Sequence, residues 1–190
     1  MPLPPRDVFA AAARRAVEEL HTEWDSPHSF QILCWDGANL NCRTYACLMP
    51  DIDPPKYPAM MTGLAREDHE KHPGEPAYAY LLQIECFGVT APLPGATKDE
   101  IVQYNVDRMG RTFHQRADAV ESCTAWVADI HGRLWTASKT RDKPSQINEA
   151  FYPPGKLPVG GQMINGLLAV AQATGTLSYG LPMPFSAGMN

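Results

Sequence analysis

One carboxylate in the longest apolar stretch of the chain is the first candidate for chemistry. Glu85 follows Gln83 on the same side of a predicted strand, and a buried carboxylate is costly unless it has a partner or a function. If the sheet brings Arg43 and Tyr45 beside it, they form a carboxylate–guanidinium site for a small ligand, with His114 as a further catalytic candidate. The alternative, which we favour, is a structural salt bridge or an exposed face.

Aromatic and basic residues are interspersed over residues 119–141, and such a pattern on a sheet can bind nucleic acid. Aromatic rings stack on bases, and basic side chains hold phosphates. The same face would also carry apolar residues such as Ala128 and Ile130, so core packing is the favoured interpretation. The formal charge of −5 also disfavours nucleic acid as a partner. The candidate binding residues are Trp126, Trp135, Arg133, Lys139 and Arg141.

Two residue pairs that contain histidine are weaker candidates for a site. Cys123 and His131 could form a nucleophile–base pair, but a strand rises about 3.3 Å per residue and so separates them by about 25 Å. His69 and His72 could share a metal ion on one helix face, but the zinc-protease pattern needs the second histidine one residue further on. We therefore predict no metal site and no cofactor, and we interpret Cys123 as structural.

Cysteine usage and the N-terminal sequence favour a cytoplasmic protein. The five cysteines are an odd number without a Cys-x-x-Cys pair, which indicates buried free thiols rather than a disulfide framework. Charged residues stand where the apolar core of a signal peptide would lie, and no apolar run approaches the roughly 20 residues of a membrane span. We expect no membrane partner.

The first half of the chain predicts two helices and three strands. Residues 6–24 carry an apolar stripe at helical spacing, and a second, short helix should begin near Pro58 and end before Pro73. Asp36–Asn39 has the composition of a hairpin turn. Residues 77–90 are apolar on both faces, as expected of a central strand. The two strands of the hairpin are predicted at 30–35 and 40–49.

A capping box marks the start of a third helix. Thr97 and Glu100 have the spacing at which two side chains satisfy free backbone amides at a helix N-terminus. Val102, Val106 and Met109 follow at helical spacing, so an amphipathic helix is predicted here.

The hairpin of residues 119–141 has His131-Gly132 as its predicted two-residue turn. Counting outward from this turn places Trp126 opposite Ala137 and Cys123 opposite Thr140. Trp126 and Trp135 would then be diagonal neighbours on one face of the sheet.

The C-terminal part of the chain has weaker periodicity. The segment at about 143–161 is rich in proline and glycine and is predicted to be irregular. A last helix is predicted over 162–174. The tail 175–190 is apolar, and we expect it to pack on the body or to contact another subunit.

These elements predict a single α+β domain over residues 1–190. Its sheet should be mostly antiparallel, possibly mixed, with about five strands from two hairpins and a central strand, packed by three to four helices. For function we favour a noncatalytic cytoplasmic protein that binds another protein or a small ligand, with the C-terminal tail as the candidate contact for a protein partner or for self-association. The alternatives are a small enzyme with a scattered site around Glu85 and nucleic-acid binding through the 119–141 hairpin.

Overall fold

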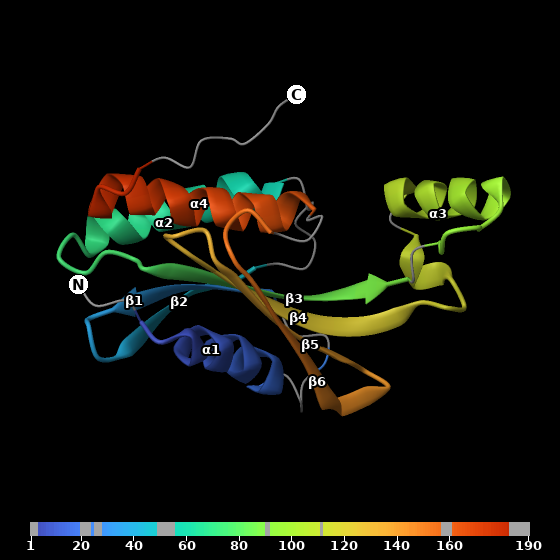
Figure 1. Ribbon diagram of the computed structural model, residues 1–190, viewed down its shortest axis with the longest axis horizontal. Helices are drawn as coiled ribbons and strands as arrows, with labels where there is room; N and C mark the ends of the chain where they lie inside the picture. Colours follow the sequence, from blue (N-terminus) through green and yellow to red (C-terminus); the bar gives the residue numbers. More distant parts are fainter. Residues whose placement is uncertain are drawn as a thin grey trace.

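One antiparallel sheet divides the molecule into two layers of core. The computed structural model describes residues 4–19, 24, 28–48, 56–89, 92–110, 112–156 and 161–182, except the side chains of 44–48 and 108. Helix α1 covers one face of the sheet, and α2 and α4 lie side by side over the other (Figure 1). The predicted α+β class is confirmed.

The elements in chain order are α1 (Arg6–Glu19), β1 (His28–Trp35), β2 (Leu40–Leu48), α2 (Tyr57–Lys71), β3 (Ala79–Gly88), α3 (Lys98–Gly110), η2 (Phe113–Gln115), β4 (Val120–Asp129), β5 (Leu134–Thr140), β6 (Lys143–Tyr152) and α4 (Gln162–Tyr179).

The strands are ordered β2-β1-β3-β4-β5-β6, and every neighbouring pair is antiparallel. Strand β3 is interior and apolar on both faces, as its sequence predicts. On the α1 side, Phe9 and Val17 pack over Leu81 and Val127. On the other side, the apolar residues of α2 and α4 pack over a second set, namely Phe30, Ile32, Tyr80, Leu82 and Leu134. Each such side chain contributes about 1.5–3 kcal/mol by leaving water.

The turn of the 119–141 hairpin is one residue longer than predicted. Asp129 pairs with Arg133 through its backbone amide, so the loop has three residues and ends on Gly132 at φ +74°. The Asp129 carboxylate accepts the amides of His131 and Arg133, at 3.1 and 2.9 Å, and fixes this loop. The predicted register is therefore wrong by one residue.

This shift sends the two tryptophans to opposite faces, because side chains alternate along a strand. Trp135 lies opposite Val127 and packs on the α1 side, whereas Trp126 lies opposite Thr136 and packs on the other side. Cys123 faces Lys139 rather than Thr140.

The predicted irregular segment at 143–161 is in part a strand. Residues 143–152 form β6, which pairs with β5 alone. As an edge strand it carries proline and many polar residues, so its sequence lacks the apolar alternation of the interior strands.

Helix α4 continues five residues beyond its predicted end. Gly175 lies inside the helix, where a Cβ atom would come within 2.7 Å of the Ile130 carbonyl oxygen. The helix ends instead at Gly180, whose φ of 65° suits a left-handed C-terminal cap. Residues 175–179 thus belong to the helix, and residues 183–190 of the predicted tail lie outside the described part of the chain. At the N-terminal end of the chain, the predicted helix over residues 6–24 is too long, because Trp24 lies in a turn.

The backbone of Gly132 gives a test of the three-residue turn. We expect Gly132→Ala to lower the free energy of unfolding by about 1–2 kcal/mol, because an L-residue is strained in the left-handed region. Gly74→Ala is the control, since Gly74 has an ordinary φ and open space around it. Urea unfolding of both variants measures the difference, and equal stability would contradict the assigned turn.

Candidate functional site

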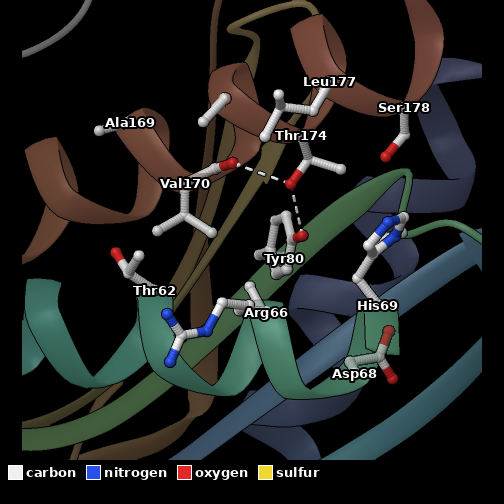
Figure 2. A pocket seen from close by; sticks show the side chains of 13 residues that line it. Thr62, Arg66, Asp68, His69, Tyr80, Ala169, Val170, Thr174, Leu177 and Ser178 are labelled. Carbon is white, nitrogen blue, oxygen red and sulfur yellow. Dashed lines mark hydrogen bonds between the residues drawn. The ribbon is translucent and has the colours of Figure 1, made fainter. Parts of the chain in front are cut away.

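A cavity of about 450 Å³ opens between α2 and α4 and is a candidate binding site (Figure 2). Its size lies in the range of small-ligand pockets. Most of the exposed lining is apolar. The lining residues are Thr62, Ala65, Arg66, Asp68 and His69 from α2, Ala77 and Tyr80 at and near β3, and Ala169, Val170, Ala173, Thr174, Leu177 and Ser178 from α4.

Helix α4 supplies an uncharged wall. None of its 18 residues is acidic, basic or a histidine. Ala169, Ala173 and Leu177 recur every four residues, so they lie on one side of the helix. The side chain of Leu177 is 86% exposed, and the two alanines are exposed as well. Small side chains at two of these positions leave the space that the cavity occupies.

Close contact of the two helices fixes one end of the cavity. A Cβ atom at Gly166 would come within 2.8 Å of the Pro58 ring, so glycine allows α4 to rest on the start of α2. The cavity lies further along both helices, where its lining includes Ala65, Ala169 and Ala173.

The floor of the cavity is a tyrosine–threonine hydrogen bond. The Tyr80 hydroxyl lies 2.6 Å from Thr174 Oγ1, and Thr174 donates its own hydrogen to the Val170 carbonyl oxygen at 3.0 Å (Figure 2). Tyr80 must therefore be the donor to Thr174. Burial raises the pKa of Tyr80 to about 12, so this phenol stays neutral and is a poor acid or base near neutral pH.

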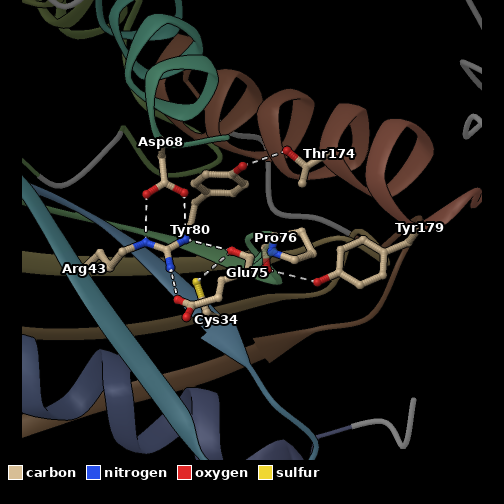
Figure 3. Close-up of polar contacts among 8 residues, drawn as sticks. All are labelled: Cys34, Arg43, Asp68, Glu75, Pro76, Tyr80, Thr174 and Tyr179. Carbon is tan, nitrogen blue, oxygen red and sulfur yellow. Dashed lines mark hydrogen bonds and ion pairs between the residues drawn. The ribbon is translucent and has the colours of Figure 1, made fainter. Parts of the chain in front are cut away.

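Beneath the cavity, Arg43 binds two carboxylates, one from α2 and one from the loop between α2 and β3 (Figure 3). Its guanidinium donates to both oxygens of Asp68 at 2.7 Å, and Asp68 is 2% exposed. It also donates to the Glu75 carboxylate at 3.0 Å and to the Glu75 carbonyl oxygen at 2.9 Å. Asp68 is thus neutralised by a bidentate partner and is not free to act as a general base.

The residues predicted around Glu85 do not come together. Arg43 lies opposite Ile32, and Ile32 opposite Tyr80, all on the α2–α4 side. Glu85 lies opposite Cys123, which packs on the α1 side. The predicted Glu85–Arg43 site is therefore wrong, because odd-numbered residues of β3 point away from the face that Arg43 occupies.

Of the two remaining members of that site, only His114 has a described side chain. His114 is in η2, where its ring is 6.1 Å from that of Phe87, near the end of β3. Tyr45 pairs with Phe30 through its backbone, and its side chain is outside the described part of the structure. The salt bridge that the sequence favoured does exist for Arg43, but with Asp68 and Glu75 as partners.

The aromatic and basic residues of the hairpin do not form one face either. Besides the split of the two tryptophans, Lys139 is fully buried, with its ammonium 5.8 Å from the Trp24 ring centre. Arg133 is paired with the buried Asp129, and Arg141 with Glu121. These charges are tied to the protein itself and are not a free surface for phosphates.

Thiol chemistry is unfavourable at the buried cysteines. Burial raises the pKa of Cys34 to about 11 and that of Cys123 to about 12, so both stay protonated and poorly nucleophilic. Cys42 is exposed, which the expectation of buried thiols missed. The side chain of Cys47 lies outside the described residues.

Sequence reasoning missed Asp68, Tyr80 and Thr174 as partners in one site. They come from α2, β3 and α4, and Thr174 is 94 positions from Tyr80. One signal in the sequence could have indicated the site. Apolar residues recur every four positions in an uncharged helix, and this pattern predicts an apolar helix face that can bind a ligand.

Comparison with known protein families, curated proteins and solved structures found no match to this chain. What the cavity binds must therefore follow from its own residues. Among the described residues, no three metal-ligating side chains form a cluster, and none of the described helices has the length and apolar character of a membrane span.

The Arg43–Asp68 pair gives a stability prediction. We expect Arg43→Met to cost about 3 kcal/mol or more, because it leaves the buried Asp68 carboxylate without its bidentate partner. Arg66→Met is the control, since Arg66 is 80% exposed on the same helix as Asp68. Guanidinium unfolding compares the two, and similar small losses would mean that the pair is not a main support of the fold.

His28 gives a pH prediction. Its Nε2 lies 3.2 Å from the Glu85 carbonyl oxygen and its Nδ1 contacts the Tyr57 hydroxyl, so the neutral ring donates to one and accepts from the other. Burial lowers the pKa of His28 from 6.5. Between the lowered value and 6.5 the unfolded chain binds more protons, so the free energy of unfolding falls as the pH falls through this window.

We expect His28→Gln to flatten this dependence when urea unfolding is compared between about pH 7.5 and about pH 5.5. His69→Gln, at an exposed position of α2, should keep the slope of the unaltered protein. An unchanged slope in His28→Gln would show that another group carries it.

Proposed function

We propose that this chain is a noncatalytic cytoplasmic protein that binds a small amphiphile between α2 and α4. The observation that carries the proposal is the cavity of about 450 Å³, with an uncharged apolar wall on α4 and polar side chains on α2. The hydrocarbon part of the ligand lies against Ala169, Ala173 and Leu177. Its head group lies at the mouth, next to Arg66 and His69.

The charges around the cavity favour an anionic head group. Asp68 is the only carboxylate among the described lining residues, and Arg43 neutralises it. Arg66 is the cation of the lining; its ion pair with Glu70, at 3.9 Å, is long and exposed and so contributes little, which leaves the side chain able to turn toward a ligand. A carboxylate or phosphate matches the fork of donors that a guanidinium offers.

A binding role fits the lining better than catalysis does. Among the described lining residues, the side chains of His69 and Ser178 make no hydrogen bond to each other or to another residue, so no nucleophile is activated by a base. Tyr80 and Asp68 are committed to Thr174 and Arg43. The cavity thus has the means to hold and orient a ligand but no assembled group to transform it.

Titration calorimetry with dodecanoate and with 1-dodecanol tests the proposal. We expect both to bind, the carboxylate more tightly. Arg66→Glu should weaken dodecanoate about tenfold, a change of about 1.4 kcal/mol, and leave dodecanol nearly unchanged. Ala173→Trp should block both by filling the cavity from an exposed position, so that folding is unaffected.

Glu67→Trp is the matched control, because Glu67 is an exposed residue of α2 outside the cavity lining. It should bind both probes like the unaltered protein. Binding that survives Ala173→Trp would place the ligand elsewhere, and an equal loss of both probes in Arg66→Glu would remove the head-group assignment.

A further inference from the structure

The polar side chains of the cavity between α2 and α4 differ in depth. Arg66 and His69 lie on the exposed side of α2, and the Arg66 guanidinium carries only hydrogen-bond donors. Asp68 and Tyr80, by contrast, are almost fully buried. The mouth and the floor of the cavity therefore offer a ligand different hydrogen-bonding groups.

The hydroxyl of Tyr80 has already used its hydrogen. A phenol carries one donor and can also accept. The donor goes to Thr174 Oγ1 at 2.6 Å, because the Thr174 hydrogen goes to the Val170 carbonyl oxygen at 3.0 Å. In Figure 2 the Tyr80 hydroxyl lies between the two helices and points toward Thr174. What Tyr80 can still offer to a molecule in the cavity is a lone pair on its oxygen.

The other inner polar side chains offer no donor either. Both oxygens of Asp68 receive Arg43 at 2.7 Å, and an ionised carboxylate has no hydrogen to give. Thr174 uses its own hydrogen within α4. The three inner polar side chains, Asp68, Tyr80 and Thr174, thus present acceptors, whereas the donors of Arg66 lie at the mouth.

We propose that the preferred ligand is a hydroxylated alkyl carboxylate whose hydroxyl donates a hydrogen bond to the Tyr80 oxygen, an inference that rests on the proposed binding of an anionic amphiphile. A plain hydrocarbon over Tyr80 keeps water from this oxygen without replacing the hydrogen bond, which is costly at a buried site. A hydroxyl supplies the bond. The carboxylate of the same ligand meets the donors of Arg66 at the mouth.

A carbonyl group in place of the hydroxyl should be rejected. A ketone is of nearly the same size but has only lone pairs, which would face the lone pair of Tyr80. A site that hydrogen-bonds a ligand group discriminates strongly against an analogue without that hydrogen, whereas an apolar pocket discriminates weakly by size. Hydroxy and oxo compounds that are otherwise identical therefore separate hydrogen-bond donation from polarity in general.

Titration calorimetry tests the inference with dodecanoate, with hydroxydodecanoates that differ in the position of the hydroxyl, and with the oxo compounds of the same positions. We expect one position at which the hydroxy compound binds about three- to tenfold more tightly than dodecanoate and the oxo compound more weakly. Tyr80→Phe should abolish this preference and still bind dodecanoate. The Thr174 hydroxyl keeps its bond to Val170 in this variant, and thermal unfolding verifies that the variant folds.

Thr62→Val is the matched control. The Thr62 hydroxyl also lines the cavity and donates to the Pro58 carbonyl oxygen at 2.8 Å, but Thr62 is exposed. This variant should keep the preference for the hydroxy compound, and its loss here would place the hydroxyl at the rim and overturn the assignment to Tyr80.

The remaining outcomes separate this inference from the proposed function. If dodecanoate binds but no hydroxyl position gains affinity, if an oxo compound binds more tightly than its hydroxy partner, or if the preference survives Tyr80→Phe, the inference is overturned and the amphiphile site stands. If neither dodecanoate nor any hydroxylated analogue binds, the proposed function is overturned and the inference with it.

Discussion

The register of an antiparallel sheet decides which side chains can meet in this protein. Side chains of cross-strand partners lie on the same face of the sheet, and successive side chains along a strand alternate between the two faces. The register therefore determines whether a side chain of β1 to β5 lies on the α1 side or on the α2–α4 side. Arg43 and Tyr80 lie on the α2–α4 side, whereas Glu85, Cys123 and Lys139 lie on the α1 side. The cavity and the buried Lys139 are therefore on opposite faces of the sheet.

Two helices turn one of these faces into a site. Tyr80 alone would be an ordinary core residue, but Thr174 of α4 engages its hydroxyl, and Asp68 of α2 lies above Arg43. Glycines at 166 and 175 let α4 approach α2 and the turn at Ile130. The helix is closely packed at these two glycines, and small side chains line the space between α2 and α4, so that a cavity remains there.

Much of the fold follows from periodicity, and the errors have local physical causes. The central strand, the first hairpin and the capping box at Thr97 are found where the sequence predicts them. The second hairpin is displaced because the Asp129 carboxylate holds two amides of a three-residue loop, an effect that composition alone does not reveal. Strand β6 was missed because an edge strand needs little apolar character. The site was missed for a different reason: its residues meet only through tertiary packing.

The position of α3 outside the sandwich separates its stability from that of the core. A helix of this length is marginal by itself in water, so α3 can open locally while the sheet stays intact. The Thr97–Glu100 cap therefore matters more for α3 than a cap does for a helix that the core holds in place, because it stabilises the helix where few tertiary contacts do so.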